Sequence, residues 1–390
     1  MDKRFVYADN AATTPVAAEV LNKMLPYYTG EFGNPSAGFY SLGQRAKAAI
    51  EEARQNVAAV IGAEAKEIIF TGSGTEADNM ALRGFMHSKQ AKGRRRLITT
   101  AIEHHAILHT ADALRDEGFN VVILPVDNNG VVDLVALENA INEDTALVSI
   151  MTANNEIGTI QPLREIADIC HKKGVLFHTD AVQAFGHIPI NVKELGIDML
   201  SLSGHKINAP KGIGALYVRS GIALQSYITG GGQEKGRRAG TENVAGIVAL
   251  GEAARLKGEN MEREMAYVRS LSKRLQEQVL ARIPQCALTG HPENRLPGNS
   301  SFVFAAIEGE TLIMDLNLAG ICAATGSACS TASLDPSHVL LGIGLSHERA
   351  HGSLRLTLDV MNTEDDVDYI VENLEKILER RRKMSPVWEE

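Results

Sequence analysis

Short apolar runs alternate with helix-length spacers from about residue 66 onward, and this pattern limits the fold more than any other feature of the sequence. Such alternation is typical of βαβ units, in which parallel strands form one sheet. The runs that we expect to be strands are Glu67–Thr71, Arg96–Thr100, Val121–Pro125, Ala146–Met151, Leu176–Thr179, Met199–Ser203 and Gly214–Val218. The sequence therefore predicts an α/β fold with a mainly parallel, seven-stranded sheet.

The last third of the chain has a different pattern. Residues 245–284 contain no strand signal and predict one or two long helices. Beyond them, Ser300–Phe304 and Ser353–Leu358 predict strands and Glu364–Lys383 predicts a terminal helix. We therefore expect a second, smaller α+β domain.

The domain boundary is expected inside the helical stretch 245–284. The predicted large domain spans residues 15–255. The predicted small domain combines residues 256–390 with the N-terminal residues 1–14.

Charge and cysteine usage exclude several classes of function. The net charge of −9 argues against nucleic acid or an anionic membrane surface as partner. The 4 cysteines are too few and too scattered for a disulfide framework, and no CxxC pair indicates a zinc site. The sequence has no signal peptide and no apolar stretch near the ~20 residues of a membrane span. We therefore expect a soluble cytoplasmic protein. We also expect it to hold no metal.

Polar residues directly after the expected strands are the best guide to a site, because open α/β sheets bind ligands at the carboxyl ends of their strands. The first strand is followed by a small-residue turn that contains Gly74 and Thr75 and opens a helix. Its backbone N–H groups and the Thr75 hydroxyl could bind a phosphate. The alternative is an ordinary glycine turn with a threonine cap.

A histidine and a carboxylate follow further strands. Glu103, His104 and His105 come after the second strand, and adjacent residues point in different directions. We therefore expect a single histidine in a ligand pocket, or plain polarity at a helix start, rather than a metal pair. Asp180 ends another apolar strand, where a buried carboxylate needs a cationic partner.

Lys206 follows the strand Met199–Ser203, next to His205. Desolvation or nearby positive charge could lower the pKa of its amine and let it form a Schiff base, although a lone strand-end lysine could equally be a surface residue. The combination of phosphate cradle, histidine, carboxylate and lysine at successive strand ends matches the needs of pyridoxal 5′-phosphate (PLP). PLP is therefore the predicted cofactor.

At this point the chain resembles the cysteine desulfurases of the NifS- and IscS-like branch, which are class-V aminotransferases of the fold-type I PLP enzymes. The resemblance runs nearly end to end. It rests on Tyr7–Pro15, Phe32–Ser36, Thr71–Asn79, Glu103 and His104, Asn154–Gly158, Asp180–Gln183, Ser203–Lys206, Arg238–Asn243 and Gly326–Cys329. It implies PLP-dependent removal of sulfur from L-cysteine, with L-alanine as the second product.

The resemblance also implies roles around the cofactor ring. Lys206 would form the imine with PLP and move protons at the substrate Cα, and Asp180 would pair with the pyridinium nitrogen. His104 would stack on the ring and assist proton transfer. Asn155 and Gln183 would hydrogen-bond the substituted edge of the ring.

Further residues are implied to bind the phosphate and the substrate. The phosphate group would be held by Gly74, Thr75, Ser203 and His205, with Thr241 reaching in from the second subunit of a homodimer. Asn34 and Arg355 would bind the substrate carboxylate, a task that suits a guanidinium.

Cys329 is the implied sulfur acceptor. It lies in the small, polar run Ala324–Ser333, which does not read as core, whereas a buried structural thiol is the usual alternative for a cysteine. As a thiolate it would attack the substrate sulfur and become a persulfide. The sulfur would then pass to an acceptor such as an iron-sulfur scaffold protein. Cys170, Cys286 and Cys322 match no such position and are expected to be structural.

Two departures from the family leave questions open. Tyr40 stands where many relatives carry a histidine, and the chain ends soon after Trp388, without the longer tail by which some relatives dock a scaffold. The sulfur acceptor therefore stays open. A selenocysteine lyase or a small-amino-acid aminotransferase on the same scaffold is the alternative function, and a non-catalytic sulfur carrier is a third.

Overall fold

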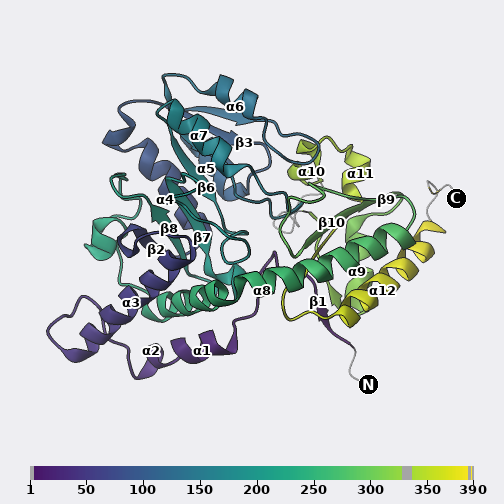
Figure 1. The fold of residues 1–390 in the computed structure, drawn as a ribbon, viewed down its shortest axis with the longest axis horizontal. Coiled ribbons are helices and arrows are strands. Elements are labelled where there is room, and N and C mark those ends of the chain that lie inside the picture. The colour runs from purple at the N-terminus through teal and green to yellow at the C-terminus, as the bar shows by residue number, and fades with distance from the viewer. Residues whose placement is uncertain (1–3, 327–335, 385–387, 389–390) are drawn as a thin grey trace.

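The computed structural model describes residues 4–326, 336–384 and 388, and its centre is a seven-stranded sheet (Figure 1). Its strands are β2 (Ile68–Thr71), β3 (Arg96–Thr100), β4 (Asn120–Leu124), β5 (Thr145–Ser149), β6 (Leu176–Asp180), β7 (Met199–Ser203) and β8 (Gly214–Val218). They lie in the order β2-β8-β7-β6-β5-β3-β4, and β8 alone runs antiparallel to its neighbours. The predicted mainly parallel sheet is confirmed.

Both faces of this sheet are buried, which explains why its strands are apolar throughout. Leu147 packs on one side against residues of α4 (Gly74–Met86) and α5 (His105–Asp116). Val148 packs on the other side against α3 (Ser41–Val60), α7 (Leu163–Lys172) and the start of α8 (Val244–Arg282). Successive strand residues point to opposite faces, so each strand contributes to two separate cores. The helices α1 (Ala18–Met24), α2 (Pro26–Thr29) and α6 (Leu134–Ala140) complete this part.

A second core forms around a three-stranded antiparallel sheet in the last third of the chain. The sheet has the order β12-β10-β9. Its strands are β9 (Cys286–Leu288), β10 (Asn299–Phe304) and β12 (Ser353–Thr357), and the nearby helices are α9 (Gly309–Leu318), α10 (His338–Gly342), α11 (His347–His351) and α12 (Glu364–Arg382). The predicted strands and the terminal helix of this region are confirmed to within a few residues.

The N-terminus belongs to the second core. The short strand β1 (Val6–Tyr7) pairs in parallel with β11 (Ile321–Cys322), and Asp9 forms a bridge with Thr357. Val6 is buried in the same cluster as Phe302 of β10. The chain therefore starts in the second core, crosses to the first, and later returns.

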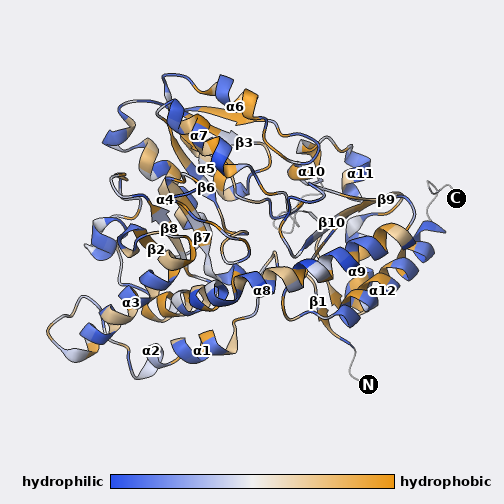
Figure 2. Cartoon of the chain, viewed as in Figure 1, coloured by the Kyte–Doolittle hydropathy of each residue, from blue (hydrophilic) through white to orange (hydrophobic). Residues whose placement is uncertain are grey.

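The long helix α8 joins the two cores, as Figure 1 shows. Residues Ala245 to Ala254 pack in the first core, and Leu271, Leu275 and Val279 pack in the second. Figure 2 shows hydrophilic and hydrophobic residues interspersed along α8 and α12, as expected for helices with one buried side. The domain division at residue 255 stays a prediction, and the change of core within α8 supports it.

No helix in the described ranges is long and apolar enough to cross a membrane.

Candidate active site

A pocket of about 420 Å³ lies where the carboxyl ends of β2, β3, β6 and β7 meet. It brings together most of the residues that the sequence singled out. The predicted site residues that line it are Gly74, Thr75, His104, Asn155, Asp180, Gln183, Ser203, His205, Lys206 and Arg355. The expectation that strand-end residues converge is therefore met for the nine of them that end or follow strands of the large sheet, and Arg355 joins them from β12.

One end of the pocket is the start of α4, which follows β2 after a two-residue turn. Ser73 caps the helix, since its Oγ accepts a hydrogen bond from the N–H of Glu76 at 3.0 Å. Gly74 packs so closely that an added β-carbon would lie 2.7 Å from Cγ2 of Val182 and 3.3 Å from Cβ of Ser203. The first-turn N–H groups of a helix have no partner within the helix and attract anions. This end of the pocket can therefore hold a phosphate.

Lys206 and His205 lie in a short 3₁₀ turn directly after β7. The Lys206 Nζ donates hydrogen bonds to the carbonyls of Ala11 at 2.5 Å and Ala12 at 2.8 Å. Burial and the adjacent Lys206 lower the pKa of His205 to about 4, so its ring is neutral at pH 7. His205 can therefore offer hydrogen bonds but no charge to an anion.

Two buried carboxyl groups, those of Asp78 and Asp180, line the pocket. Asp180 ends β6, and its Oδ1 accepts a hydrogen bond from the N–H of Val182 at 2.8 Å. Burial raises the pKa of Asp180 to about 6, although Val182 and Lys206 favour its ionised form. Burial and Asp180 also hold the pKa of Asp78 above its ordinary range, and Asp78 Oδ1 has no hydrogen-bond partner. Asp78 therefore keeps its proton, and Asp180 is the group that ionises.

His104 caps the N-terminus of α5. Its Nδ1 accepts a hydrogen bond from the N–H of Ala106 at 3.1 Å, which leaves the ring proton on Nε2. Burial, the charge of Lys206 and neighbouring histidines lower the pKa of His104 to about 4. The ring is therefore neutral and able to take up a proton.

The expectation of a single histidine in the pocket is wrong. His105 and His338 line the pocket as well, and their ring centres lie 4.8 Å apart. His338 comes from α10, whose Val339 and Leu340 pack with Ile102 and Met151, and sequence spacing could not place it in the pocket. No group of three or more histidine, cysteine or acidic side chains in the described ranges could hold a metal ion.

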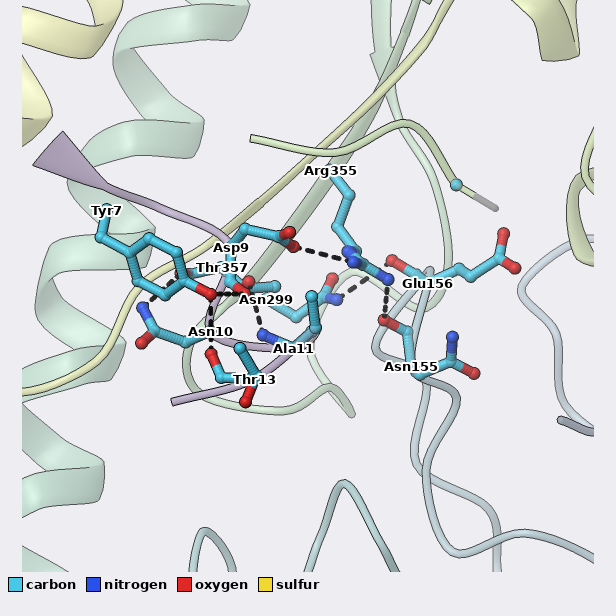
Figure 3. A network of polar contacts seen from close by, with 12 residues as sticks. Tyr7, Asp9, Asn10, Ala11, Thr13, Asn155, Glu156, Asn299, Arg355 and Thr357 are labelled. Carbon is cyan, nitrogen blue, oxygen red and sulfur yellow. Dashed lines mark hydrogen bonds and ion pairs between the residues drawn. The ribbon is translucent and has the colours of Figure 1, made fainter. Parts of the chain in front are cut away.

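Arg355 of β12 reaches the pocket from the second core, as Figure 3 shows. It is 2% exposed, yet its Nη2 donates to Oδ1 of Asp9 at 2.8 Å and its Nη1 donates to the Asn155 carbonyl at 3.1 Å. Among the described residues, its buried Nε has no hydrogen-bond partner. A guanidinium held in this way can accept a carboxylate from a small ligand.

Two predicted site residues, Asn34 and Thr241, do not line the pocket, and a third, Cys329, cannot be placed because it is not among the described residues. Asn34 is exposed, and its Oδ1 accepts a hydrogen bond from the N–H of Ser36 at 2.9 Å. Thr241 is exposed on the stretch before α8. The roles expected for these three stay predictions.

Sequence reasoning also missed residues that help to form the pocket. Asp78 lies one helical turn after Gly74, and Glu156 follows Asn155 directly, so each was within reach of a motif already noted. Asp9 was part of the N-terminal motif, but only the fold shows that it meets Arg355.

Comparison with known proteins identifies the family. The model of the protein family described as "Aminotransferase class-V" matches residues 6–370. The chain belongs to the aminotransferase class-V family. A "Cysteine desulfurase IscS" from Clostridium botulinum strain Hall is 54% identical over 99% of this chain and 97% of its own length. A protein of the same name from Methanosarcina thermophila is 52% identical over 99% of this chain and 95% of its own length.

Solved structures agree with this assignment. A "NIFS-LIKE PROTEIN" has a TM-score of 0.91 and 39% identity, and the match covers 97% of this chain and 100% of that chain. Class-V aminotransferases of this kind depend on PLP, so PLP is the cofactor. The pocket fits it, because it offers helix N–H groups for a phosphate, a buried carboxylate for a cationic ring nitrogen, and an amine.

Proposed function

We propose that the chain is a PLP-dependent cysteine desulfurase that takes sulfur from L-cysteine, releases L-alanine and holds the sulfur as a persulfide on Cys329. The observation that carries the proposal is the meeting of Lys206, Asp180 and His104 in one pocket with Arg355. These groups supply an amine, a carboxylate, a neutral imidazole and a carboxylate receptor. Two relatives that are 54% and 52% identical to this chain are named cysteine desulfurase, which supports the same activity.

The groups around the pocket then have distinct tasks. PLP, when bound, supplies an electron sink for charge that develops at the substrate Cα. Asp180 holds a cationic ring nitrogen, and the start of α4 with Thr75, Ser203 and His205 holds the phosphate. Gln183 and the side chain of Asn155 bind the edge of the ring.

The substrate is held and deprotonated by this chain's own side chains. Arg355 binds the cysteine carboxylate through the N–H groups that Asp9 and Asn155 leave free, and Asn34 is assigned to the same carboxylate. The Lys206 amine removes the proton at Cα. The neutral His104 ring, which carries its proton on Nε2, donates and accepts protons beside the substrate.

Cys329 carries out the sulfur transfer. Its thiolate sulfur forms a bond to the substrate sulfur while the substrate Cβ–S bond breaks, and the electron pair of that bond stays with the carbon. A proton delivered to Cβ completes the methyl group, and the proton held by the Lys206 amine returns to Cα, which completes alanine. Cys329 is left as a persulfide, and its outer sulfur is then transferred to a thiol or an acceptor protein.

The test of this function measures sulfide and alanine released from L-cysteine by the PLP-loaded protein with a thiol reductant present. We expect equal amounts of the two products. Cys329→Ala should keep the cofactor absorbance and lose both products, whereas Lys206→Ala should lose the absorbance of bound PLP. Full activity of Cys329→Ala on cysteine would refute the persulfide mechanism, and turnover of selenocysteine alone would favour a selenocysteine lyase.

The working unit in this proposal is a homodimer, with Thr241 of each subunit completing the phosphate site of its partner. Thr241 is exposed and does not reach the pocket of its own chain, which supports a role across an interface. Exposed aromatic side chains at Tyr28, Phe32, Phe39 and Tyr40 offer apolar area to a second subunit.

The sulfur acceptor is proposed to be a protein such as an iron-sulfur scaffold, and the cytoplasm is the proposed location. The free thiols Cys170, Cys286 and Cys322 support a reducing compartment.

A further inference from the structure

Gly326 and Ser337 lie side by side, although ten residues separate them in the sequence. A β-carbon added to Gly326 would lie only 3.2 Å from Cβ of Ser337. Between them in the sequence lies the segment 327–335, which contains Cys329. We call the contact between Gly326 and Ser337 the neck of this segment. A contact that fixes the neck therefore fixes Gly326 and Ser337, the two residues that flank the segment with Cys329.

One carboxyl oxygen contacts both sides of the neck. Oε2 of Glu156 accepts a short hydrogen bond from the Ser337 hydroxyl. The same oxygen would lie 2.6 Å from a β-carbon added to Gly326. Figure 3 shows that the Glu156 side chain extends away from Arg355 and Asp9. The position of Glu156 therefore suits the neck rather than the guanidinium beside it.

The backbone of Glu156 is itself held firmly. Its N–H donates to Oδ1 of Asn154 at 2.8 Å, and its carbonyl accepts from Nδ2 of Asn299 at 3.0 Å. The side chain is 4% exposed. Asn299 belongs to β10 of the second core, whereas Glu156 follows β5 of the first. Glu156 thus ties the neck to a rigid point between the two cores.

We propose that Glu156 is a positioning residue for Cys329, because it fixes the neck of the segment that carries this thiol. The inference rests on the proposed persulfide chemistry. A nucleophile must come within about 3–3.5 Å of the atom it attacks, and a misplacement of 1 Å can cost roughly a hundredfold in rate. A fixed neck limits such misplacement without any contact between Glu156 and the substrate.

The charge of Glu156 decides which variant is conservative. Burial raises its pKa to about 7, while the Ser337 hydroxyl and Arg355 favour the ionised form. Its neutral form is therefore well populated at pH 7. Glutamine copies that form and keeps an oxygen that can accept from Ser337, whereas alanine removes the contact.

The test compares Glu156→Ala and Glu156→Gln as PLP-loaded proteins. We expect Glu156→Ala to lower kcat by roughly ten- to a hundredfold. The KM for cysteine, the absorbance of bound PLP and the rate at which iodoacetamide alkylates Cys329 should stay unchanged. Glu156→Gln should restore most of kcat. Gly326→Ala places a methyl group against Oε2 of Glu156 and should lower kcat to the same extent as Glu156→Ala. It tests the proposal if Glu156→Ala does not fold.

Glu67→Gln is the matched control, because Glu67 is 5% exposed and is not among the residues that line the pocket, and its loss should leave kcat unchanged. An unchanged kcat in both Glu156→Ala and Gly326→Ala would overturn the proposal. A raised KM or lost PLP would overturn it as well, because Glu156 would then act on bound substrate or cofactor through the pocket that it lines. If Glu156→Ala lowered the rate of Cys329 alkylation by the same factor as kcat, Glu156 would act on the reactivity of the thiol itself. Failure of the proposed function is separate, since it would show as no sulfide from the unaltered protein.

Discussion

Two buried glutamates show how strongly local hydrogen bonding sets the charge of a side chain. Glu67 accepts N–H bonds from Glu64 at 3.0 Å and Ser220 at 2.8 Å, and these bonds lower its pKa although burial acts in the opposite direction. Glu103 is fully buried, and burial raises its pKa to about 8 despite hydrogen bonds from Thr100 and Met151. Glu67 is therefore charged in the folded protein at pH 7, and Glu103 is mostly neutral.

We predict opposite pH dependences of stability from these two residues. The raised pKa of Glu103 means that its contribution is full below its unfolded pKa of about 4.3 and is lost as the pH rises towards 8. Glu103→Gln should therefore gain stability relative to the unaltered protein between pH 5 and pH 8. Glu67→Gln should show the reverse trend, losing less stability at low pH than at pH 7. Urea unfolding of the PLP-free proteins at several pH values measures both.

Parallel slopes for the two variants over that pH range would contradict this account. In that case the charge of Glu103 would be the same in the folded and unfolded chains, and its carboxyl would not be neutral in the folded protein at pH 7.

At the scale of elements, the site depends on where α4 begins. Its N-terminus approaches β8 so closely that a β-carbon on Gly214 would lie 2.6 Å from the Ser73 carbonyl carbon and 2.7 Å from the Leu202 oxygen. Backbone atoms cannot move aside as a flexible side chain can. The glycine at the start of β8 therefore sets the place of the phosphate cradle.

Gly214→Ala should push α4 away from β8. We expect a loss of about 1–3 kcal/mol in the free energy of unfolding, as for other overpacked sites, and a clearly weaker affinity for PLP. Gly38→Ala is the control, because nothing lies within 4 Å of its added β-carbon and its φ is not positive. PLP titration followed by fluorescence measures the difference, and equal affinities in the two variants would show that the close approach has no role in binding.

The elements of the first core could be predicted well from sequence, for a physical reason. Strands such as Thr145–Ser149 are buried on both faces, so their residues form continuous apolar runs that stand out from the helices. The ends of these strands also placed Asp180 and Lys206 correctly. The short strands Val6–Tyr7 and Ile321–Cys322 were missed because two residues carry no periodicity.

Contacts between distant parts of the chain could not be predicted in the same way. Asp9 and Arg355 are 346 residues apart, and only the packing of the N-terminus on the second core brings them together. His338 of α10 also lines the pocket, because Val339 and Leu340 of that helix pack with Ile102 and Met151, far from them in the sequence. Charge and hydropathy patterns describe what each element buries, but not which side chains of two cores meet.

At the scale of the whole molecule, one chain does not supply every residue assigned to the site. Thr241 is exposed and lies apart from the pocket that contains Lys206 and Asp180. Tyr28, Phe32 and Phe39 are exposed apolar side chains near the N-terminus, and Phe39 is fully accessible. A closed, two-fold symmetric dimer would bury such side chains and place each Thr241 at the other subunit.

This arrangement predicts that two inactive variants restore each other. In a mixed dimer of Lys206→Ala and Thr241→Ala subunits, one pocket would combine the intact Lys206 of one chain with the intact Thr241 of the other. Each mixed dimer has one intact site of two, so the purified mixed species should show about half of the normal activity. Subunits are exchanged by co-expression with two different tags, and the mixed species is purified and assayed for sulfide.

The matched control pairs Lys206→Ala with Asp180→Ala, because both side chains line the pocket of a single chain. No mixed dimer of these two variants contains an intact site, and no activity should return. If the first pair regains no more activity than the second, Thr241 does not act across an interface, and the phosphate must be held within one subunit by the start of α4, Ser203 and His205. If both pairs regain activity, the pocket itself would have to be shared between subunits, which the lining of the pocket by residues of one chain argues against.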